Sequence, residues 1–172
     1  MTIRLAKAKD LPAVASIYEA IHDEEEAGRT HTGWQRGVYP TEETARRSLQ
    51  RNELYVLEEN GQVLAAGRIN REQVDVYATI PWAHQADEVL VLHTLVVHPA
   101  AKGKGCGKAF VRYYEELALA QGIHELRIDT NENNTAARGL YKALGWAERG
   151  IVPCVFNGIP GVGLVCLEKY MG

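Results

Sequence analysis

The chain has 172 residues, of which 46% are hydrophobic and 24% charged, and 19 Lys and Arg against 22 Asp and Glu give a formal net charge of −3. This length fits one domain that buries a core without metals or disulfides, and the composition excludes an intrinsically disordered chain. The slight negative charge also argues against a protein held to nucleic acid through a broad basic surface.

Cysteine and histidine usage indicates a reducing compartment and no zinc site. Cys106, Cys154 and Cys166 are odd in number and widely spaced, without a CxxC pair, and the six histidines lack HExxH spacing. The N-terminal segment has no apolar stretch typical of a signal peptide, and the most apolar run, Val89 to Val97, is too short to cross a bilayer. We therefore expect a cytoplasmic protein with no metal ion and no membrane partner.

The N-terminal half alternates predicted strands and helices. Thr2–Leu5 reads as a short strand, and apolar residues between Leu11 and Ile21 recur at helical spacing before an acidic run, Asp23–Glu26. Thr41, followed by two glutamates, is a plausible N-cap for a second helix that reaches about Leu49.

The centre of the chain contains the clearest hairpin. Leu54–Leu57 and Val63–Ala66 flank Asn60-Gly61, a dipeptide that suits a tight primed turn. Segment Asn70–Asp87 is ambiguous, and Val89–Val97 predicts a strand that Pro99 ends. A helix is expected after the glycine-rich segment Lys102–Lys108, followed by a strand at Leu126–Ile128 and a helix at Thr135–Leu144. Two strands between Val152 and Glu168, around a turn region at Asn157–Gly163, end the predicted elements. No repeat or linker interrupts the chain, so we expect one mixed α/β domain over residues 1–172.

The glycine-rich segment is the strongest chemical signal. Glycines at alternate positions let backbone N–H groups approach a ligand closely, and a following helix N-terminus favours anions. The pattern predicts a phosphate or pyrophosphate cradle, although a turn stabilised by its own helix cap would show the same residues. The segment contains Gly103, Gly105 and Gly107 together with Lys102, Lys104 and Lys108.

The spacing argues against two common phosphate-binding loops. A nucleoside-triphosphate loop needs a glycine where Lys102 stands and a hydroxyl residue where Ala109 stands. A dinucleotide fingerprint needs GxGxxG, which this segment lacks, although Asp129 lies about as far downstream as the ribose-binding acid of that motif. A dinucleotide-dependent enzyme therefore stays open as a weak hypothesis.

Two motifs make the sequence resemble the GNAT superfamily of acyl-CoA N-acyltransferases. Lys102–Gly107 is similar to the signature [QR]xxGx[GA], with Lys102 in place of glutamine or arginine, and Asn134–Trp146 matches NxxAxxLYxxxG[FW]. The resemblance covers about Leu90 to Trp146. It implies an α/β (α+β) fold, a single GNAT-like domain with a central mixed, mostly antiparallel, twisted sheet flanked by helices. It also implies transfer of an acetyl group from acetyl-CoA to a primary amine.

The resemblance also implies an acetyl-CoA site. Backbone groups of Leu95, Val96 and Val97 would pair with the pantetheine arm, as an added strand would. Asn134 would hydrogen-bond the pantetheine or cap the helix that follows, with Asn133 as the alternative if the register shifts by one. Lys102 would supply charge, and the pyrophosphate would lie on N–H groups of Gly103, Lys104, Gly105, Cys106, Gly107 and Lys108.

Two residues are candidate catalysts. Tyr141 falls at the family's general-acid position, and a phenol with a pKa of about 10 can protonate a departing thiolate; a core aromatic is the alternative. His93 is the candidate base, since Val91 stands where some family members carry a glutamate. Strand alternation predicts that His93 shares a face with Leu95 and Val97; a buried histidine with a structural role is the alternative. His98 and Cys106 are weaker candidates, and Cys106 would rather fill space in the loop.

The acceptor is the least specified part. The acidic run Asp23–Glu26, Trp34 and Tyr39, and Trp82 could attract or enclose a cationic amine, or could simply be a solvated helix end and structural aromatics. A small amine, an amino acid, an aminoglycoside-like antibiotic and a protein or peptide amine all stay open. The alternative function is a CoA-binding regulatory or sensor module with little or no catalysis. A homodimer through the glycine-rich C-terminal strands and a monomer are both compatible with the sequence.

Overall fold

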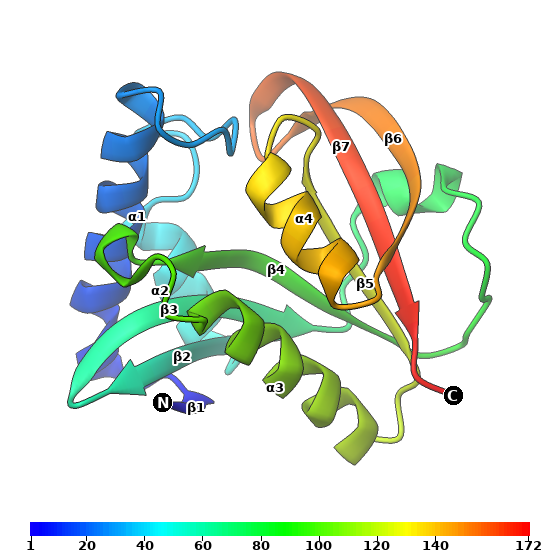
Figure 1. Cartoon of the computed structure of the whole chain (residues 1–172), viewed down its shortest axis with the longest axis horizontal. Coiled ribbons are helices and arrows are strands. Elements are labelled where there is room, and N and C mark those ends of the chain that lie inside the picture. Colours follow the sequence, from blue (N-terminus) through cyan, green and yellow to red (C-terminus); the bar gives the residue numbers. More distant parts are fainter.

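The computed structural model describes all 172 residues and contains one seven-stranded sheet in the order β1-β2-β3-β4-β5-β7-β6 (Figure 1). Every neighbouring pair is antiparallel except β4 and β5, which run parallel. This confirms the expected mixed, mostly antiparallel sheet. The strands are β1 (Thr2–Leu5), β2 (Leu54–Glu59), β3 (Gln62–Asn70), β4 (Val89–Val97), β5 (Glu125–Asn131), β6 (Ala147–Phe156) and β7 (Ile159–Tyr170).

Helices cover both faces of the sheet. The α-helices are α1 (Leu11–Glu26), α2 (Glu42–Gln50), α3 (Cys106–Ala120) and α4 (Thr135–Ala143), and short 3-10 helices are η1 (Ala8–Asp10), η2 (Asp75–Thr79) and η3 (Pro99–Ala101). No helix combines the length and the apolar character that a bilayer-spanning segment requires.

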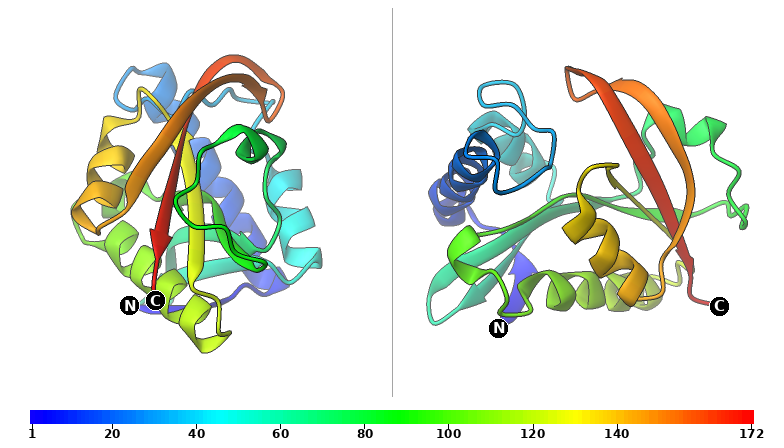
Figure 2. Two further views of the ribbon diagram at one scale, coloured as in Figure 1. Left: turned by 90° about the vertical axis from the view of Figure 1, so that its right-hand side faces the viewer. Right: turned by 45° about the horizontal axis from the view of Figure 1, so that its top comes forward.

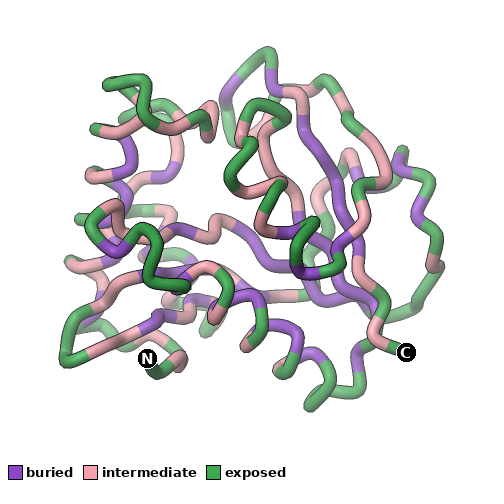
Figure 3. Tube along the Cα trace, in the orientation of Figure 1, coloured by how far each residue is buried: buried purple, intermediate pink, exposed green.

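Three buried clusters hold these layers together. The largest, of 19 residues, joins α3 and α4 to one sheet face through side chains such as Phe110, Tyr114 and Leu92. A second joins α1 and α2 to the opposite face of β2, β3 and β4, and a third packs the η2 segment against β4 and β7. Figures 1 and 2 show this arrangement, and Figure 3 shows the buried residues along the central strands. Helices α1 and α2 and the η2 segment therefore lie on the same side of the sheet, opposite α3 and α4.

Most predicted elements are confirmed, with three differences. Helix α3 begins at Cys106, inside the glycine-rich segment, and not after Lys108. The β6–β7 connection is only Asn157-Gly158, because both strands are longer than predicted. The ambiguous segment divides between the end of β3 and η2.

Strands β4 and β5 pair at one end and then separate. Their register runs from Val89↔Glu125 to Leu92↔Ile128 and stops there. On the other side of β4 a register shift lies between the pairs Arg68↔His93 and Ala66↔Val96, where Thr94 adopts a left-handed φ of 50°. This bulge gives β4 an extra residue and bends it away from β5, which opens the sheet in its middle (Figure 1).

A buried ionic cluster lies at the paired end of β5, away from this opening. Arg127 Nε lies 3.5 Å from Glu125 Oε1, Arg149 Nε lies 2.5 Å from Glu168 Oε1, and His84 Nδ1 lies 3.9 Å from Glu125 Oε2. The spacing of the histidine and the two glutamates is that of metal ligands, but the two guanidinium groups already balance both carboxylates. Burial and the neighbouring Glu168 raise the pKa of Glu125.

This raised pKa makes stability fall as pH rises. Above the ordinary glutamate value of 4.5 the unfolded chain loses the Glu125 proton first, so the folded state binds more protons over this range. We expect the fall in Tm between pH 5 and pH 9 to be smaller in Glu125→Gln, whose amide does not ionise, than in the wild type. The exposed Glu116→Gln on α3 is the control. Equal falls in all three proteins would contradict the assignment.

Candidate active site

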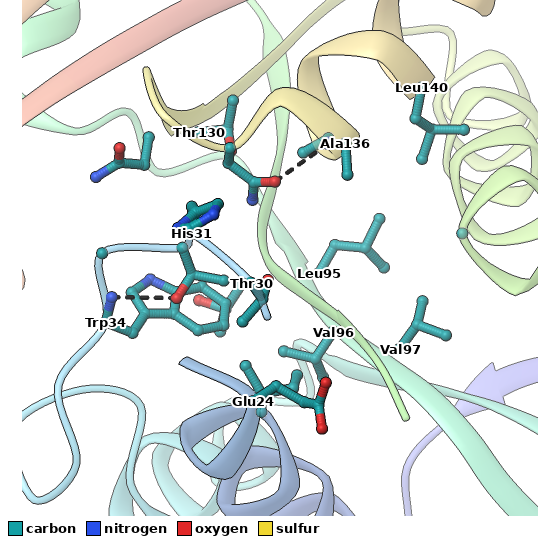
Figure 4. Close-up of a pocket in the computed structure, with 18 of the residues that line it drawn as sticks. Glu24, Thr30, His31, Trp34, Leu95, Val96, Val97, Thr130, Ala136 and Leu140 are labelled. Atoms are coloured by element: carbon teal, nitrogen blue, oxygen red, sulfur yellow. Dashed lines mark hydrogen bonds between the residues drawn. The ribbon is translucent and has the colours of Figure 1, made fainter. Parts of the chain in front are cut away.

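The opening between β4 and β5 leads into a cavity of about 720 Å³, bounded by the N-termini of α3 and α4 and by the segment from Arg29 to Tyr39 (Figure 4). Among the residues predicted to bind acetyl-CoA or to catalyse, only Lys104 lies elsewhere: it lines a second hollow beside Arg4 and Glu58. The cavity brings together the other predicted residues, which are His93, Leu95, Val96, Val97, Lys102, Gly103, Gly105, Cys106, Gly107, Lys108, Asn134 and Tyr141.

The end of β4 presents an unpaired backbone edge to the cavity. Val96 and Val97 pair with β3 on one side, but no pairing with β5 continues beyond Leu92. An edge of free N–H and C=O groups can accept an extended chain as an added strand. Residues 95–97 are therefore suited to hold a linear amide-containing ligand.

The N-terminus of α3 forms an anion cradle. Its N-cap, Gly105, has a left-handed φ of 79° and makes no side-chain cap. The backbone N–H groups of Gly105, Cys106, Gly107 and Lys108 find no acceptor within the protein, since the ladder begins with Ala109 N–H donating to Gly105 O at 2.9 Å. Unpaired N–H groups and the helix dipole favour a phosphate here. The exposed side chains of Lys102 and Lys108 add positive charge.

The cradle depends on the backbone freedom of Gly105. A Cβ there would meet no atom within 4 Å, so an alanine would be disfavoured only by the left-handed φ. We expect Gly105→Ala to lower the free energy of unfolding by about 1–2 kcal/mol. Gly139→Ala is the matched control, because Gly139 is exposed inside α4 with equally open space; it should raise stability by about 1 kcal/mol. Urea denaturation measures both, and changes of the same sign would contradict the assignment.

The bulge reverses the face expected for His93. Leu90, Leu92, Leu95 and Val97 all contact the core beneath α3 and α4, which requires the extra residue between Leu92 and Leu95. In Figure 4, Leu95 and Val97 lie on the side of Leu140, whereas Val96 lies on the side of Glu24. The prediction that His93 shares a face with Leu95 and Val97 is therefore wrong. His93 faces the same side as Val91, whose contacts belong to the η2 cluster.

Asn70 fixes the protonation of His93. Asn70 Oδ1 accepts from the backbone N–H of Glu72 at 3.0 Å, while its Nδ2 donates to Glu53 at 3.0 Å. The atom that lies 2.8 Å from His93 Nε2 is therefore an acceptor, so Nε2 carries the proton and Nδ1 keeps the free lone pair. Burial and the positive charge of Arg68 lower the pKa of His93 to about 3, which keeps the ring neutral at working pH.

Tyr141 and Asn134 reach the cavity from α4. Tyr141 is buried, its hydroxyl makes no hydrogen bond within the protein, and desolvation raises its pKa, so the phenol is protonated. Asn134 caps the helix, because its Oδ1 accepts from Ala137 N–H at 3.2 Å. This confirms the capping role, and the side-chain Nδ2 makes no hydrogen bond with the protein. Cys106 lies in the largest core cluster, as expected for a space-filling residue.

The family model for GNAT acetyltransferases matches residues 14–146. The chain belongs to the GNAT acetyltransferase family. Mycothiol acetyltransferase from Renibacterium salmoninarum is 34% identical over 67 residues, which are 39% of this chain and 19% of that protein, so the match spans about a fifth of that relative's length.

Solved GNAT structures share the fold at low identity. A GNAT acetyltransferase from Streptococcus agalactiae superposes with a TM-score of 0.82 and 22% identity, covering 99% of this chain and 95% of that one. The ribosomal-protein-alanine N-acetyltransferase from Brucella melitensis gives a TM-score of 0.73 and 21% identity, covering 99% of both chains. These likenesses confirm the GNAT fold.

In this GNAT chain the acidic run anchors a loop. Arg36 pairs with Asp23 and Glu26, and Arg29 pairs with Glu24. Glu25 accepts from the backbone N–H groups of residues 32 and 33 at 2.8 and 3.0 Å. The run therefore holds the segment from Arg29 to Tyr39 beside the cavity, and two arginines balance part of its four negative charges.

The aromatic residues proposed for the acceptor side divide into two groups. Trp34 and Tyr39 line the cavity and meet edge to face, with ring centroids 6.0 Å apart. Trp82 does not reach the cavity: its Nε1 donates to Tyr77 O at 2.8 Å, and Arg127 lies 4.1 Å from its ring centroid. The expectation that Trp82 could line the opposite wall is wrong, because the η2 segment buries it against the sheet.

Sequence reasoning missed Arg68 and Asn70 and considered Asp129 only as a ribose-binding acid. Arg68 and Asp129 line the cavity, whereas Asn70 lies behind His93 and does not. The signal that could have found the first two was their alternation, Arg68-x-Asn70, at the end of a hairpin strand that is otherwise apolar. Asp129 follows Ile128 in β5, where charged and apolar residues alternate, and desolvation raises its pKa to about 6.

Proposed function

We propose that this GNAT protein transfers the acetyl group of acetyl-CoA to the primary amine of an acceptor by direct attack on the thioester. One observation carries the proposal: the anion cradle at α3 and the unpaired edge of β4 open into the same cavity as His93 and Tyr141. The cradle fits a pyrophosphate and the edge fits an amide-containing arm. The reacting groups lie where those two features meet.

The residues that hold acetyl-CoA follow from these features. N–H groups of Gly105 to Lys108 bind the pyrophosphate, with Lys102 nearby, and backbone groups of residues 95–97 pair with the pantetheine. Asn134 Nδ2 is free to hydrogen-bond the same arm. Binding in this way places the thioester between the diverging strands, and the acceptor enters from the side of His93.

The proton transfers balance as follows. The amine nitrogen forms a bond to the acetyl carbon, the C–S bond breaks, and the departing thiolate takes the proton of the Tyr141 hydroxyl. The amine proton passes to the free Nδ1 of His93. Because the His93 pKa is low, the ring passes that proton onward to solvent and returns to its neutral form. The Tyr141 phenolate takes a proton back from solvent, so that both residues are restored for the next turnover.

Replacing Tyr141 tests the acid. We expect Tyr141→Phe to lower kcat about 10²-fold, since general-acid catalysis typically contributes this much, with little change in the KM for acetyl-CoA. Thiol release measures turnover. Tyr113→Phe is the matched control. Tyr113 lies on α3, outside the cavity, and packs against Tyr55 on β2. Unaltered turnover in Tyr141→Phe would leave Tyr141 with a packing role only.

Replacing His93 tests the base. His93→Gln should lower kcat about 10²-fold, and Asn70→Ala, which frees the ring's tautomer, should lower kcat by a smaller factor without changing the KM for acetyl-CoA. Neither variant should remove a pH limb between pH 5 and 8, because the His93 pKa of about 3 lies below that range. Wild-type turnover in His93→Gln would exclude His93 from the mechanism.

A CoA-binding module is the second candidate function. Two observations favour it: Val91 occupies the position where some family members carry a glutamate, and burial makes His93 a weak base. Isothermal titration with acetyl-CoA and thiol release across an amine panel separate the two functions. Tight binding without release on any amine would support the module and overturn the enzyme.

A further inference from the structure

A row of three polar residues crosses the sheet beneath the cavity. Arg68 on β3 pairs with His93 on β4, and the pair Val91↔Arg127 places His93 level with Asp129 on β5. Residues paired across strands share a face, and the paired strands β3 and β4 lie about 4.8 Å apart. Strands β4 and β5 begin to separate just beyond Leu92↔Ile128, so the cavity enters between His93 and Asp129. A guanidinium, an imidazole and a carboxylate therefore line one wall, and all three border the cavity.

The guanidinium of Arg68 forms two long salt bridges but keeps its hydrogen-bond donors unused. It makes no hydrogen bond within the protein, and its nearest carboxylate oxygens are Glu72 Oε2 at 3.7 Å and Glu53 Oε2 at 3.9 Å. Both oxygens already have another donor, Asn70 Nδ2 at 3.0 Å for Glu53 and Arg51 at 3.4 Å for Glu72. Arg68 thus keeps its paired N–H donors, whose geometry matches a carboxylate.

The carboxyl of Asp129 is free to bind a cation on one side. The Tyr77 hydroxyl donates to Oδ2 at 2.6 Å, while Oδ1 has no partner within the protein. A buried carboxylate with one unpaired oxygen gains most from an incoming positive group. An ammonium is such a group, and at this point it would lie beside His93 and the diverging strands.

The acceptor end of the cavity is covered. A side chain at Gly33 would collide with the Asn131 amide, so the loop from Arg29 to Tyr39 touches the end of β5. A Cβ at Gly158 would lie 3.5 Å from Val38 Cγ1, so the β6–β7 turn touches the same loop. Figure 2 shows this loop and this turn close together. These contacts narrow the opening at this end, which favours a small acceptor over an extended peptide.

We propose that the acceptor is a small free amino acid, with its ammonium on Asp129 and its carboxylate on Arg68. The inference rests on the proposed function and adds the class of acceptor. The two charged groups hold the zwitterion at both ends. The ammonium nitrogen then releases one proton to solvent before it attacks the thioester, and the proton that it loses on attack passes to His93. Trp34 and Tyr39 border the remaining space and would contact the acceptor's side chain.

The direct test compares each amino acid with its own carboxamide. Thiol release from acetyl-CoA is measured across a panel of amino acids, the matching amides, and short peptides with a free N-terminus. We expect kcat/KM for the preferred amino acid to exceed that of its amide by about 10- to 100-fold, as expected for a charge-assisted pair of hydrogen bonds. Equal values for acid and amide, or a preference for peptides, would overturn the proposal.

Substitutions then show which residues cause the preference for the free amino acid over its amide. Arg68→Gln should remove it by lowering kcat/KM for the amino acid much more than for the amide, so that the acid-to-amide ratio falls toward one, and Arg68→Lys should restore part of the ratio. Asp129→Asn should raise KM for both. Arg71→Gln is the matched control, because Arg71 is exposed just beyond β3 and pairs with Glu88. A loss of equal size for acid and amide in Arg68→Gln would contradict a carboxylate contact.

Binding measurements distinguish a failure of this inference from a failure of the proposed function. If acetyl-CoA binds but no amine releases thiol, the proposed enzyme activity fails. Thermal shifts of the acetyl-CoA-bound protein then decide the acceptor class: a rise in Tm with the free amino acid and not with its amide supports the site. No rise with any amino acid overturns it.

Discussion

The separation of β4 from β5 is the constraint on which the site depends. The two strands pair over only four residues each, from Val89↔Glu125 to Leu92↔Ile128. Thr94 then takes a left-handed conformation and forms a bulge, and its hydroxyl is hydrogen-bonded to the hydroxyl of Tyr39. The bulge leaves the last residues of β4 with an unpaired edge, admits the cavity into the sheet, and turns His93 toward the face that carries Arg68 and Asp129.

Charge is distributed so that each end of the cavity attracts a different group. The net charge of −3 averages over features with separate roles. Lysine side chains and unpaired backbone N–H groups lie together at the start of α3, where a pyrophosphate fits. The acidic run Asp23–Glu26 is partly balanced by Arg29 and Arg36, and through these pairs it anchors a loop. At the acceptor end, one guanidinium and one carboxylate keep unused hydrogen-bonding capacity.

Local signals made most of the fold predictable. Helical spacing between Leu11 and Ile21, the Asn60-Gly61 turn and the glycine-rich segment each identify an element from a few neighbouring residues. Non-local features were not predictable. One extra residue at Thr94 reverses the face of His93 relative to Leu95, and alternation alone cannot show where such a residue is inserted. Arg68 and Asp129 come together only through the order of strands β3, β4 and β5.

Hydrogen exchange with and without acetyl-CoA tests the central claim most directly. We predict that acetyl-CoA slows exchange at those N–H groups of residues 95–97 that point away from β3, and at the N–H groups of Gly105 to Lys108, because the ligand supplies the acceptors that these groups lack in the protein. Amides of the β2–β3 turn at Asn60-Gly61, which lies outside the cavity, should change little. Unchanged exchange at the cradle and at the β4 edge, under conditions where acetyl-CoA binds, would contradict the account.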